Sequence, residues 1–354
     1  MKLILNLSML GAKPTGLGMY SLVSAKIARV FRASVIGKAP PGTVFDRAIA
    51  SPASIGFGGG KYAAIRRQLW MRKLHFDNSH LVYSPTHHGL PGQQGQVITI
   101  HDLISLRFPR QHMLQYIFFR YFVPRLMKKC CAVFTVSETT RRDIVATYHY
   151  PAERIHVVPN SIDATYFTRG EVDRMNPYLL MVGARYAHKN VGEVLRQAHL
   201  WSGTYHLVVT SCSGKYRAKL ERLIDKLEIR QYVDFRDYVS ADELLRLYQG
   251  CTALVYPSKW EGFGIPPLEA LACGRPVIAS DISIHREVLG EAALFVELGN
   301  EASWRDAFKA LGDDRLIAEK LESGQGRVAH YSPTNSLRAL ETSLLAVAPN
   351  LELA

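Results

Sequence analysis

The sequence predicts two α/β domains, each built on a parallel β-sheet. Its 354 residues are long for one domain and sufficient for two, and a hydrophobic fraction of 47% provides material for two cores. Short apolar runs alternate with longer amphipathic segments, which is typical of βαβ units. The alternation occurs twice, and a polar stretch, residues 163–177, separates the two sets. We therefore expect a linker there and a domain boundary near residue 170.

The expected strands are short apolar segments, and each half of the chain has its own set. The strands of the first half are expected at residues 3–7, 81–84, 97–100, 132–136 and 155–158. Those of the second half are expected at residues 178–182, 206–210, 233–235, 253–256, 276–279 and 293–296. Near the end of the chain, residues 335–346 carry leucines and alanines at helical spacing, which predicts a closing helix.

The positive charge of the chain is concentrated in its first half. Residues 1–164 contain 21 Lys and Arg against 7 Asp and Glu, a formal charge of +14, whereas the remainder has 22 against 24, or −2. Such asymmetry indicates an anionic partner, and anionic lipid headgroups or a lipid-linked diphosphate fit it. Nucleic acid fits the charge alone, and a basic face that serves only solubility is the plain alternative. We expect the membrane surface rather than nucleic acid.

Three features bear on the compartment. The apolar start of the chain is interrupted by Asn6 and lacks a cleavage pattern, which predicts a first strand rather than a signal peptide. No apolar run approaches the ~20 residues of a membrane-spanning helix. The five cysteines include no C-x-x-C pair, which favours free thiols in a reducing compartment. We expect a cytoplasmic protein, soluble or peripheral on the inner face of the cell membrane.

The most informative segment runs from Glu261 to Glu269. Its two glutamates lie eight positions apart around Gly-Phe-Gly and a double proline, between a predicted strand and a helix predicted at residues 267–273 and closed by Gly274. Glycines at such a turn present unpaired backbone N–H groups and the positive end of a helix dipole, which suits a diphosphate. The plain alternative is a capping glutamate, but a capping box needs Ser or Thr at position 266, which is proline.

Residues 253–288 resemble the signature block of retaining glycosyltransferases of family four. The resemblance implies a GT-B fold, in which two Rossmann-like domains face each other across a cleft. It implies an acceptor-side domain at residues 1–170, with the C-terminal helix 335–354 packing back, and a nucleotide-sugar domain at 171–334.

The same resemblance assigns roles to the residues of the motif. It implies that Glu261 lies against the sugar and that Glu269 holds the ribose hydroxyls. The backbone of Gly262, Phe263 and Gly264 is expected to meet the sugar and the diphosphate.

Two cations precede the predicted helix that begins near residue 190. Arg185 and Lys189 are unfavourable at a helix N-terminus, so a bound anion explains them better. In the resembled family a lysine at this place neutralises the diphosphate, which matches Lys189. The usual arginine positions hold Ala184 and His188 here, so Arg185 is expected to act from its own position.

Other contacts with the donor are expected elsewhere in the chain. Tyr238 and Val239 follow a strand and are expected to flank the nucleotide base through their backbone. The chain contains no D-x-D, so the metal site of the other large glycosyltransferase fold has no ligands. We expect neither a metal nor a cofactor, with Lys189, a second cation and helix dipoles in the metal's place.

Glycines also follow the first predicted strand. Gly16 and Gly18 lie in a loop before an apparent helix, where backbone can approach a phosphate, although a plain tight turn is the alternative. The spacing and the missing acidic residue argue against an NAD site. The resemblance implies that these glycines face the diphosphate of the donor.

Histidines follow two strands of the first half. His101 and Asp102 stand at the carboxyl end of a predicted strand, where ligands bind in parallel sheets. The resemblance implies that the histidine touches the donor sugar near the scissile bond, whereas a buried core histidine is the alternative. His87 and His88 follow another strand in the same way and are candidates for acceptor contact.

The sequence thus predicts a retaining hexosyltransferase, with catalytic roles for Glu261, His101, Lys189 and Arg185. It moves a sugar from a nucleotide-sugar donor to a hydroxyl of a glycan or lipid-diphosphate-linked acceptor. The segments around His101 and Glu261 most resemble mannosyltransferases of O-antigen and exopolysaccharide synthesis, so GDP-mannose is the expected donor. UDP-glucose, UDP-N-acetylglucosamine and dTDP-rhamnose stay open. The rival from another class is a non-catalytic protein of the same fold that binds glycan, membrane or nucleic acid.

Overall fold

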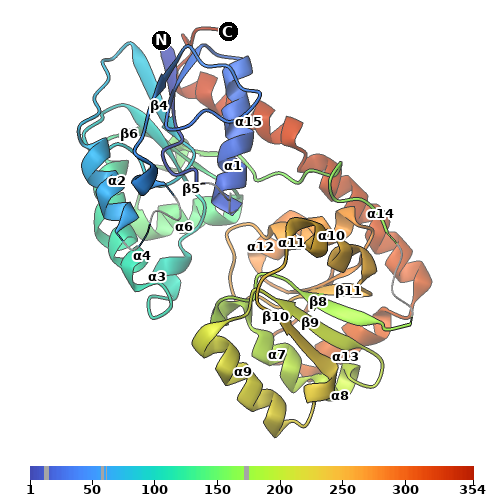
Figure 1. Cartoon of the computed structure of the whole chain (residues 1–354). Coiled ribbons are helices and arrows are strands. Elements are labelled where there is room, and N and C mark those ends of the chain that lie inside the picture. The colour runs from blue at the N-terminus through green and yellow to red at the C-terminus, as the bar shows by residue number, and fades with distance from the viewer. Residues whose placement is uncertain (12–15, 57–59, 61, 171–174) are drawn as a thin grey trace. The chain divides into compact units, whose positions relative to one another are not determined.

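A computed structural model of the chain describes residues 1–11, 16–56, 60, 62–170 and 175–354. The chain divides into two compact units, drawn in Figure 1: Met1–Ser161 with Pro333–Ala354, and Ile162–Ser332. The boundary between them falls before the expected residue 170, because the polar stretch belongs to the second unit. The backbone N–H of Ile162 donates to Tyr331 O at 2.9 Å, and Gln249 Nε2 donates to Thr168 O at 3.1 Å.

The first unit contains a seven-stranded parallel sheet in the order β3-β2-β1-β4-β5-β6-β7. Its strands are β1 (Lys2–Asn6), β2 (Ala33–Ile36), β3 (Arg47–Ile49), β4 (His80–Ser84), β5 (Gln96–Ile100), β6 (Cys130–Thr135) and β7 (Ile155–Val157). The sequence pattern did not predict β2 and β3. The three residues of edge strand β3 are exposed or half-buried, so this strand lacks the apolar run that marks the others.

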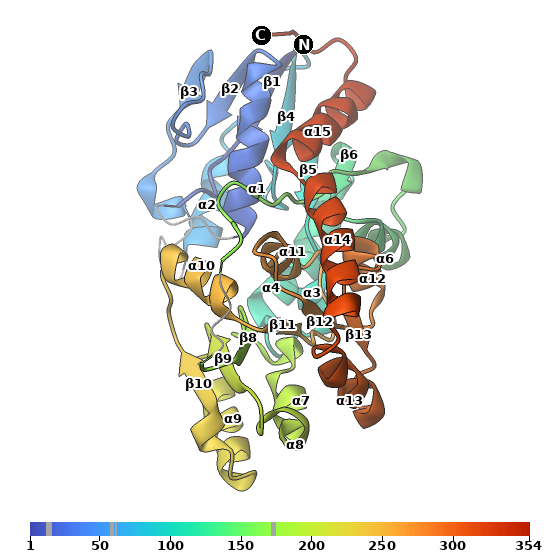
Figure 2. The same cartoon turned by 90° about the vertical axis from the view of Figure 1, so that its right-hand side faces the viewer.

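The helices of the first unit include the last helix of the chain. They are α1 (Gly16–Ala25), η1 (Lys26–Arg29), η2 (Ala53–Ile55), α2 (Ala63–Met71), α3 (Ile104–Arg107), α4 (Met113–Ile117), the π-helix η3 (Phe118–Phe122), α5 (Val123–Met127), α6 (Glu138–Tyr148), η4 (Ala152–Arg154) and α15 (Pro333–Val347). Helix α15 packs on α1 and β7. The chain ends lie side by side (Figure 2), and the N–H of Glu352 donates to Met1 O at 2.9 Å.

The second unit contains a six-stranded parallel sheet in the order β10-β9-β8-β11-β12-β13, which is the strand order of a Rossmann fold. Its strands are β8 (Tyr178–Met181), β9 (His206–Thr210), β10 (Val233–Arg236), β11 (Ala253–Tyr256), β12 (Val277–Ser280) and β13 (Leu294–Val296). Each lies within one residue of its predicted bounds. Its helices are η5 (Ala187–Lys189), α7 (Val191–Arg196), α8 (Ala198–Trp201), α9 (Gly214–Lys226), η6 (Arg230–Tyr232), α10 (Ala241–Gly250), α11 (Ile265–Ala272), α12 (Ser283–Leu289), α13 (Glu301–Ala310) and α14 (Asp314–His330).

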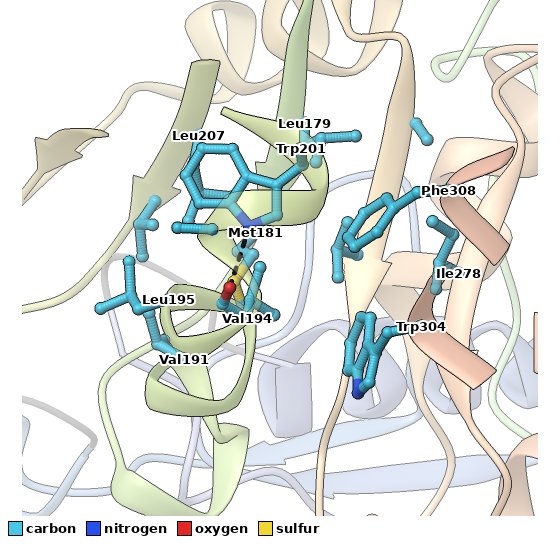
Figure 3. Packing of buried hydrophobic residues seen from close by; sticks show 14 of the residues in the cluster. Leu179, Met181, Val191, Val194, Leu195, Trp201, Leu207, Ile278, Trp304 and Phe308 are labelled. Atoms are coloured by element: carbon cyan, nitrogen blue, oxygen red, sulfur yellow. Dashed lines mark hydrogen bonds between the residues drawn. The ribbon is translucent and has the colours of Figure 1, made fainter. Parts of the chain in front are cut away.

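Alternate strand residues of the second sheet form its main core. Leu179 and Met181 of β8 pack with side chains of α7, α8, α9 and α13 (Figure 3). Trp201 and Trp304 are fully buried there, and the Trp201 indole N–H donates to Val194 O at 2.9 Å, which satisfies its polar atom. Helices α10, α11 and α12 lie on the other face of this sheet (Figure 1). The sheet is covered on both sides, as the near-continuous apolar strands require.

Candidate functional site

In the second unit, the predicted donor-binding residues meet where the strand order reverses. Strands β8 and β11 are neighbours, but the chain continues from them toward opposite edges of the sheet. Lys189 lies in the connection after β8, and Glu261 lies in the loop after β11. Ligands of parallel α/β sheets bind at this switch point, beyond the carboxyl ends of the strands.

Lys189 and Glu261, 72 residues apart in sequence, form an ion pair at this point. Lys189 Nζ donates to Glu261 Oε1 at 2.6 Å and to the Tyr256 hydroxyl at 2.9 Å. The two charged side chains are only 17% and 11% exposed. Tyr256 is the last residue of β11, and Lys189 Nζ lies 4.9 Å from the centre of its ring. Sequence reasoning missed this tyrosine, because nothing in an apolar strand marks a site residue.

The pairing keeps both groups charged. Burial works to raise the pKa of Glu261, but the Lys189 cation holds that pKa below its ordinary value. Burial likewise works to lower the pKa of Lys189, and Glu261 and Tyr256 instead raise it. Because the ion pair is little exposed, an incoming anion has to compete with Glu261 for the lysine rather than meet a free cation.

A buried histidine lies behind the ion pair. His285 Nδ1 donates to Ser280 O at 2.9 Å, and its ring centroid is 5.3 Å from that of Tyr256. Its other ring nitrogen, Nε2, is buried without a hydrogen bond to any described residue. A Cβ at Gly264 would lie 3.7 Å from His285 Cδ2, and the φ of +93° at this glycine is strained for other residues.

The turn after Glu261 differs from the prediction in one respect. Helix α11 begins at Ile265, two residues before the predicted start, so both prolines lie in its first turn. Prolines have no N–H, so the helix offers fewer free donors than the motif suggested. Phe263 is 4% exposed and packs edge-on against Tyr331, with ring centroids 5.0 Å apart. Its ring is therefore structural, and only its backbone is available to a ligand.

The second glutamate of the motif has a partner of its own. Glu269 Oε2 accepts a hydrogen bond of 2.5 Å from the hydroxyl of Tyr248 in α10. Burial raises the pKa of Glu269 to about 7, although the tyrosine hydroxyl works to lower it. A carboxylate of this pKa is only partly ionised at neutral pH.

The remaining predicted donor contacts lie apart from this cluster. Arg185 is exposed, and its guanidinium lies 5.7 Å from the ring centre of Tyr186. The contacts of the described residues do not bring it to Glu261. Tyr238 is 75% exposed after β10, and Val239 is half-buried. Their roles, like that of Arg185, stay predictions.

The first unit has a polar network at its own switch point, between β1 and β4. Asn6 Nδ2 donates to Ser84 Oγ at 3.0 Å and to His88 O at 2.9 Å, and Ser8 Oγ donates to Asn6 Oδ1 at 2.7 Å. All these side chains are buried. Apart from a polar residue within an apolar strand, no pattern in the sequence predicted this network.

His101 is fixed as a neutral imidazole. Its Nε2 lies 2.9 Å from Pro85 O, and a carbonyl only accepts, so Nε2 carries the proton and Nδ1 is an acceptor. Burial lowers the pKa of His101 to about 4, while the Pro85 carbonyl opposes that effect. The ring meets Tyr20 edge-on at 4.6 Å. Asp102 Oδ1 accepts from the Ile104 N–H at 3.0 Å and so positions the start of α3.

A buried cation stands near the candidate acceptor histidines. Arg67 of α2 is 4% exposed; its Nη1 donates to Ile55 O at 2.7 Å, and its Nη2 lies 3.4 Å from His88 Nε2. Its Nε has no hydrogen bond to a described residue, and the ion pairs within the described part of the first unit do not include it. Burial lowers the pKa of Arg67 to about 10, so it stays charged. The pKa of His87 falls to about 3, mainly through burial.

The glycines after β1 are helical rather than in a loop, which corrects the prediction. Gly16 and Gly18 lie in the first turn of α1, whereas Thr15 of the same predicted loop lies outside the described residues. A helix starts here because the apolar pattern that follows already includes Leu17. A Cβ at Gly16 would meet nothing within 4 Å, so the space beside it is open.

The described residues also bear on other kinds of site. They contain no group of three or more His, Cys, Asp or Glu side chains that could hold a metal ion. Over the same part of the chain, every helix is too short or too polar to cross a membrane.

Comparison with protein families matches both units. The model described as glycosyl transferases group 1 matches residues 163–325, and that described as glycosyltransferase family 4 matches residues 20–166. The O-antigen chain mannosyltransferase RfbU of Salmonella typhimurium is 35% identical over 347 residues, 94% of this chain and 96% of that protein. O-antigen chain mannosyltransferase B of Escherichia coli is 27% identical, over 76% of this chain and 74% of its own.

Solved structures share the fold. The crystal structure of Anabaena HepE in complex with UDP and glucose has a TM-score of 0.73 and 16% identity, covering 98% of this chain and all of that one. WaaG, a glycosyltransferase involved in lipopolysaccharide biosynthesis, has a TM-score of 0.66 and 17% identity, with 98% and 99% covered. Two parallel-sheet α/β units and these likenesses confirm the predicted GT-B fold class. The chain therefore belongs to glycosyltransferase family 4, as the motif around Glu261 predicts.

Proposed function

We propose that this enzyme transfers mannose from GDP-mannose to a hydroxyl of a growing, lipid-linked polysaccharide of the O-antigen type, with retention of configuration. The observation that carries the transfer chemistry is the buried Lys189–Glu261 ion pair at the switch point of the second sheet. The choice of mannose follows the two O-antigen mannosyltransferases among the relatives. We choose GDP as the nucleotide because GDP-mannose is the donor expected for mannose. The geometry of the described residues does not identify a nucleotide base.

The ion pair supports a charge-exchange mechanism. When the donor binds, its diphosphate takes over Lys189, and Glu261 is released to accept hydrogen bonds from sugar hydroxyls. As the bond between C1 and the phosphate oxygen breaks, Lys189 and the N-terminus of α11 stabilise the departing diphosphate. The acceptor hydroxyl attacks C1 from the same face and gives its proton to that phosphate, which retains the configuration. A covalent intermediate on Glu261 is the alternative.

We propose that the reaction needs no metal and no cofactor. A diphosphate requires positive charge, and the second unit supplies it through Lys189, with Arg185 as an exposed second cation. His101 in the first unit stays a predicted sugar contact. Because its Nδ1 is an acceptor and its pKa is low, its role is to accept a hydroxyl proton in a hydrogen bond rather than to donate one.

We propose that the acceptor binds to the first unit. Arg67 is a buried cation whose Nε makes no hydrogen bond to a described residue, and such a group suits a phosphate of a lipid-linked diphosphate near His88. Further along the chain, α4 and η3 expose Leu114, Ile117 and Phe122 by 77%, 41% and 57%. Such an apolar face within a basic unit supports a contact with an anionic membrane surface.

The experiment for this proposal is thermal unfolding with millimolar GDP, UDP, ADP and dTDP in parallel. A ligand that binds only the folded state stabilises it by RT ln(1 + [L]/Kd), about 2.7 kcal/mol at 100 times Kd. Stabilisation by GDP alone is the expected result. Stabilisation by UDP or dTDP instead moves the donor to UDP-glucose, UDP-N-acetylglucosamine or dTDP-rhamnose. No stabilisation by any of them contradicts a donor site and favours the non-catalytic binding protein.

A further inference from the structure

Tyr248 holds Glu269 from a position that no ligand can reach. Its side chain is fully buried, and its hydroxyl is 2.5 Å from Glu269 Oε2. The ring packs edge-on against Phe167 with centroids 5.8 Å apart, and Tyr248 O accepts a hydrogen bond from Cys251 Sγ at 3.3 Å. The tyrosine is therefore fixed in place, and its hydroxyl has one orientation in which to donate.

The two oxygens of the glutamate differ in availability. Oε2 is occupied by the tyrosine, whereas Oε1 has no hydrogen bond to a described residue, and Glu269 as a whole is only half-buried. A carboxylate held at one oxygen and open at the other is oriented for a single ligand direction. We propose that Tyr248 is a positioning residue for donor recognition, which turns Oε1 of Glu269 toward the ribose hydroxyls of the nucleotide. This inference rests on the proposed function, in which Glu269 holds the ribose.

The surroundings of Glu269 give Tyr248 a second effect, on charge. Tyr248 of α10 is the titratable group that acts on this carboxyl, and Glu269 in turn raises the pKa of Tyr166 before β8 and of Cys273 after α11. No cation is among them in the described part of the chain, so the tyrosine hydroxyl is the group that opposes burial. Ribose hydroxyls donate hydrogen bonds, and an ionised carboxylate accepts them best. Loss of the Tyr248 hydroxyl should therefore raise the pKa of Glu269 and lower the fraction of carboxylate that is ionised. Ribose binding should weaken most at the pH values where the Glu269 carboxyl of the variant is protonated.

The test is the dissociation constant of GDP, measured by calorimetry between pH 6 and 8.5 for the wild type, Tyr248→Phe and Glu269→Gln. Tyr232→Phe, with a tyrosine on the same unit outside this cluster, is the matched control. Protonation of GDP itself affects all four proteins equally, so it cancels when the dissociation constant of each variant is divided by that of the wild type. Folding is checked by the melting temperature of each variant, and kcat and KM for GDP-mannose are measured at pH 7 and 8.5.

We expect Tyr248→Phe to weaken GDP binding about tenfold at pH 6 and about fivefold at pH 7, as follows from a titration midpoint raised by about one pH unit, and to approach the wild type at pH 8.5. Its KM should rise with kcat little changed. The wild type should lose affinity for 2′-deoxy-GDP, and Tyr248→Phe should lose less at pH 7, because its ribose contact is already weak. Glu269→Gln should show no such pH dependence.

Three results overturn the inference and are distinguishable. If Glu269→Gln weakens GDP but Tyr248→Phe keeps the wild-type pH profile, Tyr248 does not position the glutamate and the proposed function stands. The same holds if Tyr248→Phe weakens GDP equally at every pH, since that is the result of a merely structural role. If the wild type binds none of the nucleoside diphosphates, the proposed function fails and this inference fails with it.

Discussion

The two switch points of this molecule are built on opposite electrostatic plans. In the second unit, Lys189 and Glu261 neutralise each other, so binding an anion there means exchanging one partner for another. In the first unit, Arg67 is buried beside His88, and the described part of the unit provides no carboxylate for it. Under the proposed function, the paired site suits a charged group that must also leave, whereas the unpaired cation suits a group that is only held.

The largest effect is expected at the paired site, from Glu261→Ala. We expect turnover to fall by about 10²–10³, the range for loss of one transition-state contact, while GDP still stabilises the protein. Initial rates with GDP-mannose and thermal unfolding with GDP measure the two properties. Intact turnover would remove Glu261 from the mechanism, and loss of GDP binding would make it a part of the nucleotide site instead.

Lys189→Met tests whether Lys189 and Glu261 act as an ion pair or whether Lys189 only makes the site electropositive. The pH dependence of stability distinguishes the two. In the wild type the pKa of Glu261 is depressed, so the pair adds stability above the unfolded value, about 4.3, which is lost as pH falls through the folded pKa. Without the lysine, burial raises that pKa, so the variant should lose stability as pH rises toward 8. Melting temperatures at pH 5 and 8 measure this, and turnover should fall by about 10²–10³.

Exposed Lys259, two residues before Glu261, provides the matched control for Lys189. Lys259→Met should keep both the activity and the wild-type pH dependence. If the melting temperature of Lys189→Met differed from that of the wild type by the same amount at pH 5 and pH 8, the pKa of Glu261 would not depend on Lys189.

The unpaired plan of the first unit is tested by Arg67→Gln. A hydrogen bond to a charged group contributes about 1.5–3 kcal/mol, so kcat/KM for the lipid-diphosphate-linked acceptor should fall about 10- to 100-fold. KM for GDP-mannose should not change, and exposed Arg72→Gln should change neither. An equal loss toward donor and acceptor would mean that Arg67 is structural.

The smallest effect is expected at the exposed apolar face of α4. The double variant Leu114→Asp/Ile117→Asp should bind anionic vesicles several-fold less, because anionic headgroups repel the new carboxylates. Sedimentation with vesicles of phosphatidylglycerol and phosphatidylcholine measures this. Val44→Asp changes an apolar residue outside this face that is 85% exposed, and it serves as the control. Equal binding of both variants would place the membrane contact elsewhere.

The fold was more predictable than the site, for a physical reason. Strands β9 and β11 have their predicted bounds because buried parallel strands are local apolar runs. β3 was missed because an exposed edge strand has no such run. A signature motif predicted a role for Glu261, and the cations before a helix predicted one for Lys189, but only the sheet brings the two side chains to 2.6 Å.

The partners that tune the site escaped prediction. Tyr256 ends an apolar strand and Tyr248 lies on the buried side of an amphipathic helix, so both look like ordinary core residues, and the hydroxyl of each finds its partner through tertiary packing. Asn6 was noticed only as an interruption of an apolar stretch. Long-range hydrogen bonds of this kind have no periodic signature in one sequence.

The most direct test of the central claim is the product itself. GDP-mannose carries an α-linked sugar, so transfer to a lipid-diphosphate-linked oligosaccharide should give an α-mannoside, with one GDP released for each mannose added. The anomeric coupling of the isolated product, read by NMR, decides this. A β-linked product would contradict retention and the same-face mechanism, and incorporation only from a UDP- or dTDP-linked sugar would contradict mannosyl transfer.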